Sequence, residues 1–409
     1  MNILIVTSLL PFPLNSGGAQ AQYNMIESLR KKHNIAIVYP QNANNSNYSL
    51  AQLKKRWPDV KFRRYAYTSQ LRHIPFAYEK AMRALKLFLI PNSHSFKAER
   101  VLKPYGYPLT PHFVSFVEKV AKEHQANILQ AEFYPYLGLA EKINLQIKTL
   151  FVHHEIRFVR DERMMAELKP TPKEQRTMKM QAREEIRLLN AYDAVITLTE
   201  TDCNILRKHG VVSPIFVSPA GINTPRCNYI DRPGQAFFVG GFSHAPNQEG
   251  VRWLFEKVFP LIPDNSPNGM QELGVIGMGW KHTWFDAISA FKPKLYGFVD
   301  SIADVAGGGI MLVPILSGSG MRMKILEAAA LAMPIVTTSV GKEGLAFENQ
   351  VHCLVADSPQ AFADAITLLL RDKALRRKLA LNAQELFARN YSIESLVEVR
   401  QQVYNKMTI

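Results

Sequence analysis

The sequence predicts an α/β protein built from two doubly wound, Rossmann-like domains that face a central cleft. Three observations support this fold class. Short apolar strands alternate with amphipathic helices along the chain, which is the pattern of parallel sheets covered by helices. A glycine-rich turn follows the first strand, and a proline- and glycine-rich linker lies near the middle. The length of 409 residues fits two domains with substantial cores.

The chain begins with a βαβ unit. Residues 2–8 are a continuous apolar run of the kind buried on both faces of a parallel sheet, and residues 35–39 form a second one. Between them lie Gly17 and Gly18 and a helix that extends to about Lys32. Further strands are expected at residues 128–131, 149–153, 194–198, 214–217, 236–240, 273–277, 294–296, 309–313, 334–338 and 352–355.

The linker at residues 218–225 predicts the domain boundaries. We expect a first domain over residues 1–217, with a basic and aromatic insertion at about 51–107, and a second domain over residues 218–390. The last helix, within 391–409, follows the second domain and is expected to pack back on the first. In two such domains, ligands bind at the carboxyl ends of the strands and anions bind at helix N-termini.

The positive charge is concentrated in one segment. The chain has 49 basic and 35 acidic residues, a net charge of +14. Residues 51–103 hold thirteen basic and three acidic residues, so this segment supplies ten of the fourteen charges. Within it, apolar residues recur at helical spacing while Lys80, Arg83 and Lys86 take the other face. This pattern favours an anionic membrane surface, although a core-packed helix with a solvated face would look the same.

Other classes are disfavoured. No recognisable nucleic-acid-binding motif is present, so nucleic acid is the least favoured partner. No apolar run approaches the length of a membrane span, and the N-terminus lacks the features of a signal peptide. The three cysteines are scattered without metal-ligand spacing. We therefore expect a cytoplasmic protein without a disulfide framework or a zinc site.

The stretch from residue 318 to residue 338 carries the chemistry. A glycine-rich loop opens a helix, and a strand follows Pro334. Unpaired amides at the start of that helix, together with Arg322 and Lys324, would form an anion site suited to a diphosphate. Glu327 lies further along the helix and could accept both hydroxyls of a ribose. The loop residues are Gly318, Ser319 and Gly320.

With these motifs the sequence resembles family 4 glycosyltransferases, which have the GT-B fold. The signature is the glycine-rich loop, a helix carrying Leu-Glu-Ala and the strand after Pro334. The resemblance covers essentially the whole chain and is carried by several further short motifs. These include Gly17-Gly18-Ala19-Gln20, Glu132-Phe133, His153-His154-Glu155, Pro219-Ala220-Gly221, Gly240-Gly241, Asn247 and Tyr296-Gly297-Phe298-Val299.

The resemblance implies retaining transfer of a sugar from a nucleotide-sugar donor, with no cofactor and no metal. Gly17 and Gly18 would lie beside the donor diphosphate and the acceptor, and Asn247 would belong to the donor site. A histidine after a strand of the first domain would lie near the donor sugar. His153 and His154 both fit; we prefer His154, with Glu155 as the residue that could fix a tautomer.

The sequence departs from the family pattern in two places. Many members have a second acidic residue eight positions before the equivalent of Glu327, where this chain has Ser319. Many also have an arginine and a lysine early in the second domain, and residues 240–250 have neither. Charge neutralisation is then expected to fall on Arg322, Lys324 and helix N-termini. Glu132 and Glu155 are candidates for acid/base work or for structural ion pairs.

The leading hypothesis is a hexosyl- or related glycosyltransferase in surface polysaccharide or glycan biosynthesis. It would use a glycan or lipid-linked acceptor on the acceptor-side first domain and a nucleotide-sugar on the second domain. It would bind the inner face of the cytoplasmic membrane peripherally, with Lys80, Arg83 and Lys86 on the membrane side. The alternatives are a nucleotide-sugar epimerase on the same fold and a non-catalytic protein that binds anionic lipid.

Overall fold

The chain folds into two compact units, seen in a computed structural model. Unit 1 comprises residues 1–14, 26–218 and 400–409, and unit 2 comprises residues 15–25 and 219–399. The predicted first domain, residues 1–217, therefore loses residues 15–25 to unit 2, and the last helix is divided between the units. The described residues are 1–14, 17–41, 45–66, 94–102, 109–222, 224, 227–262, 272–289, 292–317 and 321–408.

Unit 1 contains a seven-stranded parallel sheet with the order β3-β2-β1-β4-β5-β6-β7. Strands β1 and β2 are almost entirely buried, as expected for apolar runs covered on both faces. The strand order reverses between β1 and β4, where Thr7 lies opposite Glu132. The strands are β1 (Asn2–Thr7), β2 (Asn34–Pro40), β3 (Lys61–Tyr65), β4 (Ile128–Glu132), β5 (Lys148–His153), β6 (Ala194–Thr197) and β7 (Ile215–Val217).

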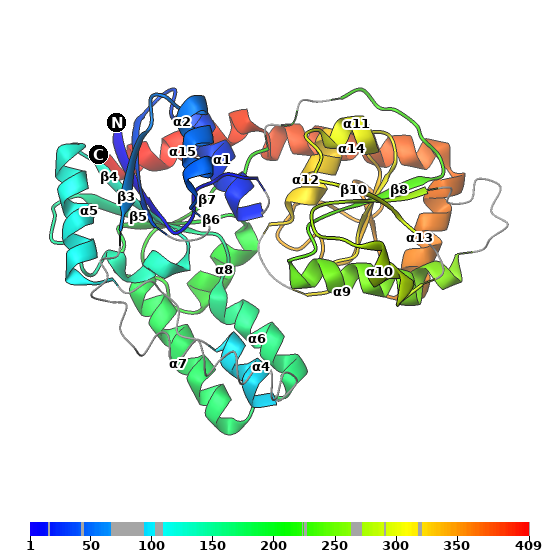
Figure 1. The fold of residues 1–409 in the computed structure, drawn as a ribbon, viewed down its shortest axis with the longest axis horizontal. Helices are drawn as coiled ribbons and strands as arrows, with labels where there is room; N and C mark the ends of the chain where they lie inside the picture. Colours follow the sequence, from blue (N-terminus) through cyan, green and yellow to red (C-terminus); the bar gives the residue numbers. More distant parts are fainter. Residues whose placement is uncertain are drawn as a thin grey trace. The chain divides into compact units, whose positions relative to one another are not determined.

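The helices of unit 1 connect these parallel strands. Helices α4, α6 and α7 pack together away from the sheet (Figure 1). Helix α1 begins in unit 2 and ends in unit 1, and α15 also passes from unit 2 into unit 1. The helices are α1 (Gly17–Leu29), α2 (Asn47–Arg56), α4 (His94–Val101), α5 (Pro111–Glu123), the 3₁₀ helix η2 (Tyr134–Leu139), α6 (Arg157–Leu168), α7 (Pro172–Leu189), α8 (Glu200–Lys208) and α15 (Ile393–Thr408).

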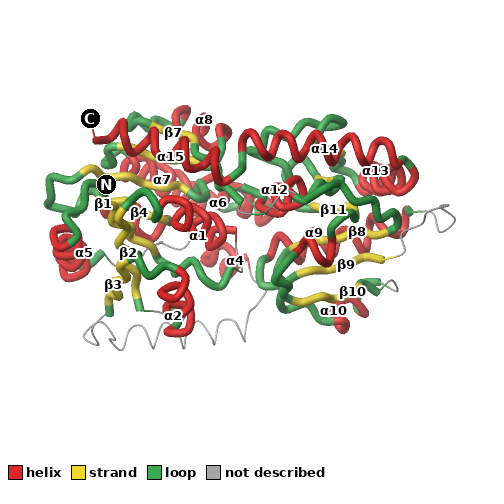
Figure 2. The backbone as a smooth tube through the Cα atoms, turned by 90° about the horizontal axis from the view of Figure 1, so that it is seen from above, coloured by secondary structure: helices red, strands yellow, loops and turns green. Residues whose placement is uncertain are grey.

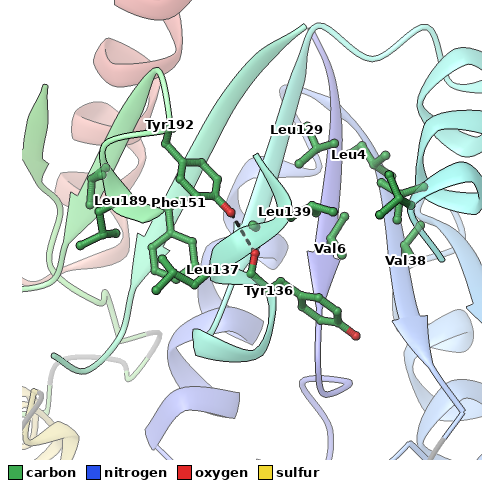
Figure 3. Packing of buried hydrophobic residues seen from close by; sticks show 14 of the residues in the cluster. Leu4, Val6, Val38, Leu129, Tyr136, Leu137, Leu139, Phe151, Leu189 and Tyr192 are labelled. Carbon is green, nitrogen blue, oxygen red and sulfur yellow. Dashed lines mark hydrogen bonds between the residues drawn. The ribbon is translucent and has the colours of Figure 1, made fainter. Parts of the chain in front are cut away.

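The core of unit 1 is formed by neighbouring strands and the segment after β4. Leu4, Val38 and Leu129 lie on three adjacent strands and are buried together (Figure 3). The Tyr192 hydroxyl donates a hydrogen bond of 2.9 Å to the carbonyl of Tyr136, so its buried polar atom has a partner. This packing fixes the end of β4 and the start of η2, which are important for the site described below.

Part of the predicted basic insertion belongs to the sheet. Strand β3 pairs with β2 in parallel register at residues 61–65, and Trp57 just before it is fully buried. Lys61, Arg63 and Arg64 are exposed on this edge strand, where charged side chains oppose pairing with another chain. The prediction of an insertion at about 51–107 is therefore wrong for residues 51–65. Lys80, Arg83 and Lys86 lie outside the described residues.

Unit 2 contains a six-stranded parallel sheet with the order β10-β9-β8-β11-β12-β13. Strands β10, β9, β8 and β11 lie side by side in Figure 2. Its strand order reverses between β8 and β11, so ligands are expected at the carboxyl ends of these two strands. The strands match the predicted ones within two residues at each end. They are β8 (Gln235–Val239), β9 (Glu272–Ile276), β10 (Lys294–Gly297), β11 (Ile310–Val313), β12 (Ile335–Thr337) and β13 (Leu354–Val355).

The helices of unit 2 cover both faces of this sheet, so its strands are buried on both sides. They are α9 (Ala245–Trp253), a π-helical turn η3 (Leu254–Val258), a 3₁₀ turn η4 (Phe259–Leu261), α10 (His282–Asp286), α11 (Ile302–Ala306), α12 (Met323–Ala330), α13 (Pro359–Arg371) and α14 (Lys373–Asn390). Within the described part of the chain, no helix is both long enough and apolar enough to cross a bilayer.

Candidate functional site

The first group of polar side chains lies in unit 2, at the point where the strand order reverses. Lys324 is in the first turn of α12, which follows β11. Its ammonium donates a hydrogen bond of 2.9 Å to Asn247 Oδ1 on α9, which follows β8. The same nitrogen lies 4.4 Å from the centre of the Phe238 ring, close enough for a cation–π interaction. Lys324, on the helix after β11, is therefore held by one residue of β8 and one residue of the helix that follows β8.

The loop after β8 supports this lysine. Asn247 is buried and donates a hydrogen bond of 2.9 Å from Nδ2 to the Gly241 carbonyl, so both ends of its amide are used. Trp280 Nε1 donates to the Gly240 carbonyl at 2.7 Å. A Cβ on Gly240 would lie 2.6 Å from Asn247 Nδ2, so only glycine permits this close approach. The Asn247 amide therefore fixes the position of the Lys324 ammonium group.

Glu327 is the second ionisable group of this cluster. It lies one turn after Lys324 on α12, is 9% exposed and accepts a hydrogen bond of 2.6 Å from Gln20 Nε2. Gln20 is in the part of α1 that belongs to unit 2. Gly17, at the start of that helix, approaches α12 so closely that a Cβ would lie 3.3 Å from Met323 Cγ. The lack of a side chain at Gly17 thus lets the start of α1 lie close against α12.

Burial sets the electrostatics of this cluster. Desolvation, followed by the charge of Arg322, lowers the pKa of Lys324 to about 7, while Glu327 opposes the shift. Burial raises the pKa of Glu327, and the Gln20 hydrogen bond and Lys324 oppose that change. Burial, Lys324 and Arg322 together lower the pKa of His244, at the start of α9. Such a cluster would gain stability from a bound anion.

The second group of side chains lies in unit 1 and contains the two adjacent histidines. His153 ends β5 and is 2% exposed. Its Nε2 lies 2.9 Å from Glu185 Oε1 on α7, and Glu185 also accepts the backbone N–H groups of Arg157 and Phe158 at 3.1 Å. Glu185 therefore satisfies the amides at the start of α6. His153 is a structural residue that joins β5 to these two helices.

His154 has a different environment. Its Nε2 lies 2.5 Å from Glu132 Oε2, at the carboxyl end of the neighbouring strand β4. Its ring stacks on Phe133 with a centroid distance of 4.2 Å and an interplanar angle of 14°. The carboxylate that meets His154 is therefore Glu132, whereas we predicted Glu155. Glu155 instead pairs with Arg160 Nη1 at 3.3 Å.

Comparison with protein families identifies the chain. Residues 15–226 match the model described as Glycosyltransferase Family 4, which covers more than half of the sequence. The chain belongs to glycosyltransferase family 4. Residues 233–372 of this glycosyltransferase also match the model described as Glycosyl transferases group 1. The family predicted from the sequence motifs is thus confirmed.

Solved structures of the same fold include proteins crystallised with UDP. Anabaena HepE in complex with UDP is 13% identical, with a TM-score of 0.68 and 100% of both chains covered. Sucrose-phosphate synthase from Thermosynechococcus elongatus is 14% identical, with a TM-score of 0.68 and coverage of 100% of this chain and 99% of that one. These neighbours and the two parallel sheets confirm the predicted GT-B fold.

Two further proteins are relevant. A TarM variant from S. aureus, in complex with fondaparinux, alpha-GlcNAc-glycerol and UDP, is 12% identical with a TM-score of 0.66, covering 99% of this chain and 100% of that one. An uncharacterized 44.6 kDa protein in the cps region of Klebsiella pneumoniae is 21% identical over 408 residues, covering 95% of this chain and 96% of that protein.

The structure brings together some of the predicted site residues. Lys324, Glu327 and Asn247 form one cluster in this glycosyltransferase, with Arg322 at the N-cap of α12 and Gly17 at the start of α1. Gly18 follows Gly17 in the first turn of α1. Gly318, Ser319 and Gly320 lie outside the described residues. Among the residues that are described, no group of three or more histidine, cysteine or acidic side chains is arranged to hold a metal ion.

Sequence reasoning missed three of the contacting residues. Gln20 was noted only as part of a motif, although its place three residues after Gly17 puts it one helical turn further along the same face. Glu185 carried no local signal, because it reaches His153 only through tertiary packing. Gln130 lies two residues before Glu132 on β4, so strand alternation places both on one face, but its contact with Tyr404 arises only from packing. Their roles become visible only when β4, β5 and α7 are placed together.

Proposed function

We propose that this enzyme transfers a hexosyl or related sugar from a nucleotide-sugar donor to a glycan or lipid-linked acceptor, with retention of configuration. The observation that carries the proposal is the pair Lys324 and Glu327 on one face of α12, each held by a side chain from another helix. The pair combines a cation for a diphosphate with a carboxylate for ribose hydroxyls. The neighbours crystallised with UDP support a nucleotide as the ligand.

The chemical step cleaves the bond between the anomeric carbon and the diphosphate oxygen. A bond from the acceptor oxygen forms on the same face, and the acceptor proton passes to the leaving phosphate. Negative charge develops on the nucleoside diphosphate, so its stabilisation should contribute most to the rate. We assign this role to Arg322, Lys324 and the N-terminus of α12, which would neutralise the diphosphate without a metal ion or cofactor.

The biological setting proposed is surface polysaccharide or glycan synthesis. The related protein of Klebsiella pneumoniae is described as lying in a cps region, which supports this assignment. The TarM complex with fondaparinux and alpha-GlcNAc-glycerol supports a glycan acceptor. A transferase would move the labelled sugar of a nucleotide-sugar to an acceptor, whereas an epimerase would leave it on a soluble product.

The proposed partner surface is an anionic membrane at the cytoplasmic face. Helix α7 exposes Lys173, Arg176, Lys179 and Arg183 along one side, and none of the four forms an ion pair with another described residue. Met180 lies among them and is 61% exposed. A basic helix face with an exposed apolar side chain suits anionic phospholipid, at roughly 1 kcal/mol per basic residue near the surface.

A nucleotide-binding experiment tests the donor site. We expect one of the nucleoside diphosphates UDP, GDP and ADP to raise the thermal midpoint of the wild-type protein, because a ligand bound only by the native state stabilises it. Glu327→Ala should weaken this binding about 10- to 100-fold, the range for a lost hydrogen bond to a charged group. Glu385→Ala, on the exposed face of α14, is the control. Equal affinity in the Glu327 and Glu385 variants would reject the assignment.

Vesicle flotation tests the membrane partner. The wild-type protein should float with vesicles that contain phosphatidylglycerol and not with neutral vesicles. The double variant Arg176→Glu/Lys179→Glu should lose this binding, whereas Arg377→Glu/Lys378→Glu on exposed positions of α14 should retain it. Loss in both variants would indicate a response to net charge alone and would contradict a role for α7.

A further inference from the structure

A chain of buried hydrogen bonds links the last helix to His154 within unit 1. The Tyr404 hydroxyl of α15 donates to Gln130 Oε1 on β4 at 2.8 Å. Gln130 Nε2 donates to Glu132 Oε1 through a short hydrogen bond, and Glu132 Oε2 meets His154 Nε2 at 2.5 Å. Tyr404, Gln130 and Glu132 are all fully buried. We refer to these three residues as the relay.

The chemistry of each group gives the relay a direction. The Tyr404 hydroxyl donates to Gln130, so the oxygen of the Gln130 amide faces Tyr404. The nitrogen of the same amide then faces Glu132. Glu132 then accepts with one oxygen, and its other oxygen is an acceptor toward His154. A carboxylate only accepts, so the Gln130 nitrogen faces Glu132 and the Gln130 oxygen faces the Tyr404 hydroxyl, which must donate. The direction is therefore set from α15 toward the histidine.

The other ring nitrogen of His154 remains available. Nδ1 is buried and has no hydrogen-bond partner among the described residues. A neutral imidazole that donates from Nε2 presents a lone pair at Nδ1, so this atom is an acceptor. A buried acceptor without a partner costs free energy unless a ligand supplies a donor. Hydroxyl groups of a sugar are donors of this kind.

The backbone beside His154 is strained in a way that supports a role in binding. Phe133 has a φ angle of +66°, in the left-handed region that an aromatic residue rarely adopts. This conformation places its ring flat against His154. Glu132 holds one edge of the imidazole and Phe133 covers one face, so the ring has little freedom to rotate. Strain of this kind persists where the surrounding structure fixes it, commonly at functional sites.

We propose that Glu132, Gln130 and Tyr404 position His154 as its Nε2–H tautomer, so that Nδ1 accepts a hydrogen bond from a hydroxyl group of the sugar substrate. The substrate part rests on the proposed glycosyltransferase function, whereas the tautomer does not. Glu132, Gln130 and Tyr404 are positioning residues, because they act through His154. The relay also gives the C-terminal helix a part in shaping the site.

Nitrogen NMR of histidine side chains tests the tautomer directly. The protein is labelled with ¹⁵N-histidine and measured at about pH 8.5, where an ordinary imidazole is neutral. The resonances of His154 are assigned from their loss in His154→Gln. We expect Nε2 to carry the proton in the wild-type protein. A proton on Nδ1 would overturn the proposal, whatever the enzyme is found to transfer.

Substitution of Glu132 should invert the tautomer. In Glu132→Gln, Gln130 still donates to the side-chain oxygen at position 132, so the new amide nitrogen must face His154 Nε2. Because that nitrogen can only donate, Nε2 becomes an acceptor and the proton moves to Nδ1. Adding Tyr404→Phe removes the hydroxyl that fixes the orientation of the Gln130 amide, and the Nε2–H form should be partly restored. An unchanged tautomer in folded Glu132→Gln would contradict the relay.

A matched variant separates the relay from general packing. Tyr192→Phe also removes a buried tyrosine hydroxyl and its hydrogen bond, but Tyr192 bonds the Tyr136 carbonyl outside the relay (Figure 3). It should leave the His154 tautomer and the activity unchanged. Glu132→Gln should lower kcat/KM about tenfold or more, with the Tyr404→Phe addition recovering part of it. Equal losses in Tyr192→Phe would indicate a structural effect and reject the positioning role.

Discussion

The two clusters of candidate site residues differ in how they are assembled. In unit 2, Arg322, Lys324 and Glu327 come from six consecutive positions, and tertiary contacts with Asn247 and Gln20 hold them. In unit 1, His154 depends on residues from β4 and from the last helix. The first cluster combines charges that attract an anion. The second presents a neutral acceptor whose direction is fixed by hydrogen bonds. The comparison teaches that charge can be supplied locally, whereas orientation requires several elements.

Removal of the Lys324 ammonium group should have the largest effect on activity. Lys324→Met deletes the charge assigned to the diphosphate, and we expect kcat to fall about 100- to 1000-fold, as for loss of one group that stabilises transition-state charge. Lys378→Met, at an exposed position of α14, is the matched control and should retain activity. Steady-state kinetics measures both. Comparable activity in the two variants would remove Lys324 from the mechanism.

The same variant has a pH signature. The pKa of Lys324 in the folded protein is about 7, below its ordinary value of 10.5. Below about pH 7 both states hold the proton, and the cost of burying the charge is fully present. Between about pH 7 and 10.5 the folded state releases a proton that the unfolded state keeps, so stability rises with pH. This rise should be absent in Lys324→Met, as measured by urea unfolding.

Nucleotide affinity should change with pH in the direction opposite to the stability. As the pH increases through about 7, the ligand-free site loses its ammonium charge, so affinity for a nucleoside diphosphate should weaken. Isothermal titration calorimetry in two buffers of different ionisation enthalpy would detect the proton taken up on binding. Binding without proton uptake in the wild-type protein would contradict the assigned charge change.

An identical substitution at the two histidines should have an intermediate and unequal effect. His154→Gln can still donate to Glu132 but loses the Nδ1 acceptor, so kcat/KM should fall about 10-fold with a stability change below about 1 kcal/mol. His153→Gln can still donate to Glu185 and should retain activity. His153→Leu should cost about 2–3 kcal/mol, because it leaves buried Glu185 with one partner fewer. Kinetics and chemical denaturation of the three variants decide between the histidines.

The smallest effect on nucleotide binding is expected from loss of the hydrogen bond that Gln20 donates to Glu327. Gln20→Leu removes the 2.6 Å hydrogen bond that lowers the pKa of this carboxyl group. The pKa should therefore rise further, and nucleotide affinity should fall about 3- to 10-fold. The difference in nucleotide affinity between the variant and the wild type should increase as the pH decreases, because Glu327 is protonated at a higher pH in the variant. Gln360→Leu removes a similar amide–carboxylate bond on exposed α13 and should show no gap.

Local patterns account for what the sequence predicted correctly. Continuous apolar runs gave β1 and β2, because buried parallel strands have no polar face to alternate with. Strand β3 was missed, since three of its five residues are basic and its side chains are mostly exposed at the sheet edge. The same charges were attributed to an insertion. The basic face of α7 was also missed, because the three glutamates of this helix dilute its positive charge along the sequence.

The sequence by itself determined the family, the two α/β units and the cluster on α12. A helix places residues three apart on one face, so Lys324 and Glu327 share a face of α12 wherever this helix packs. Only the tertiary structure decided which carboxylate holds each histidine, Glu185 for His153 and Glu132 for His154. Gln20 and Glu327 are 307 positions apart, and Tyr404 and Gln130 are 274 apart. Contacts at such separations arise from packing and leave no periodic trace along the chain.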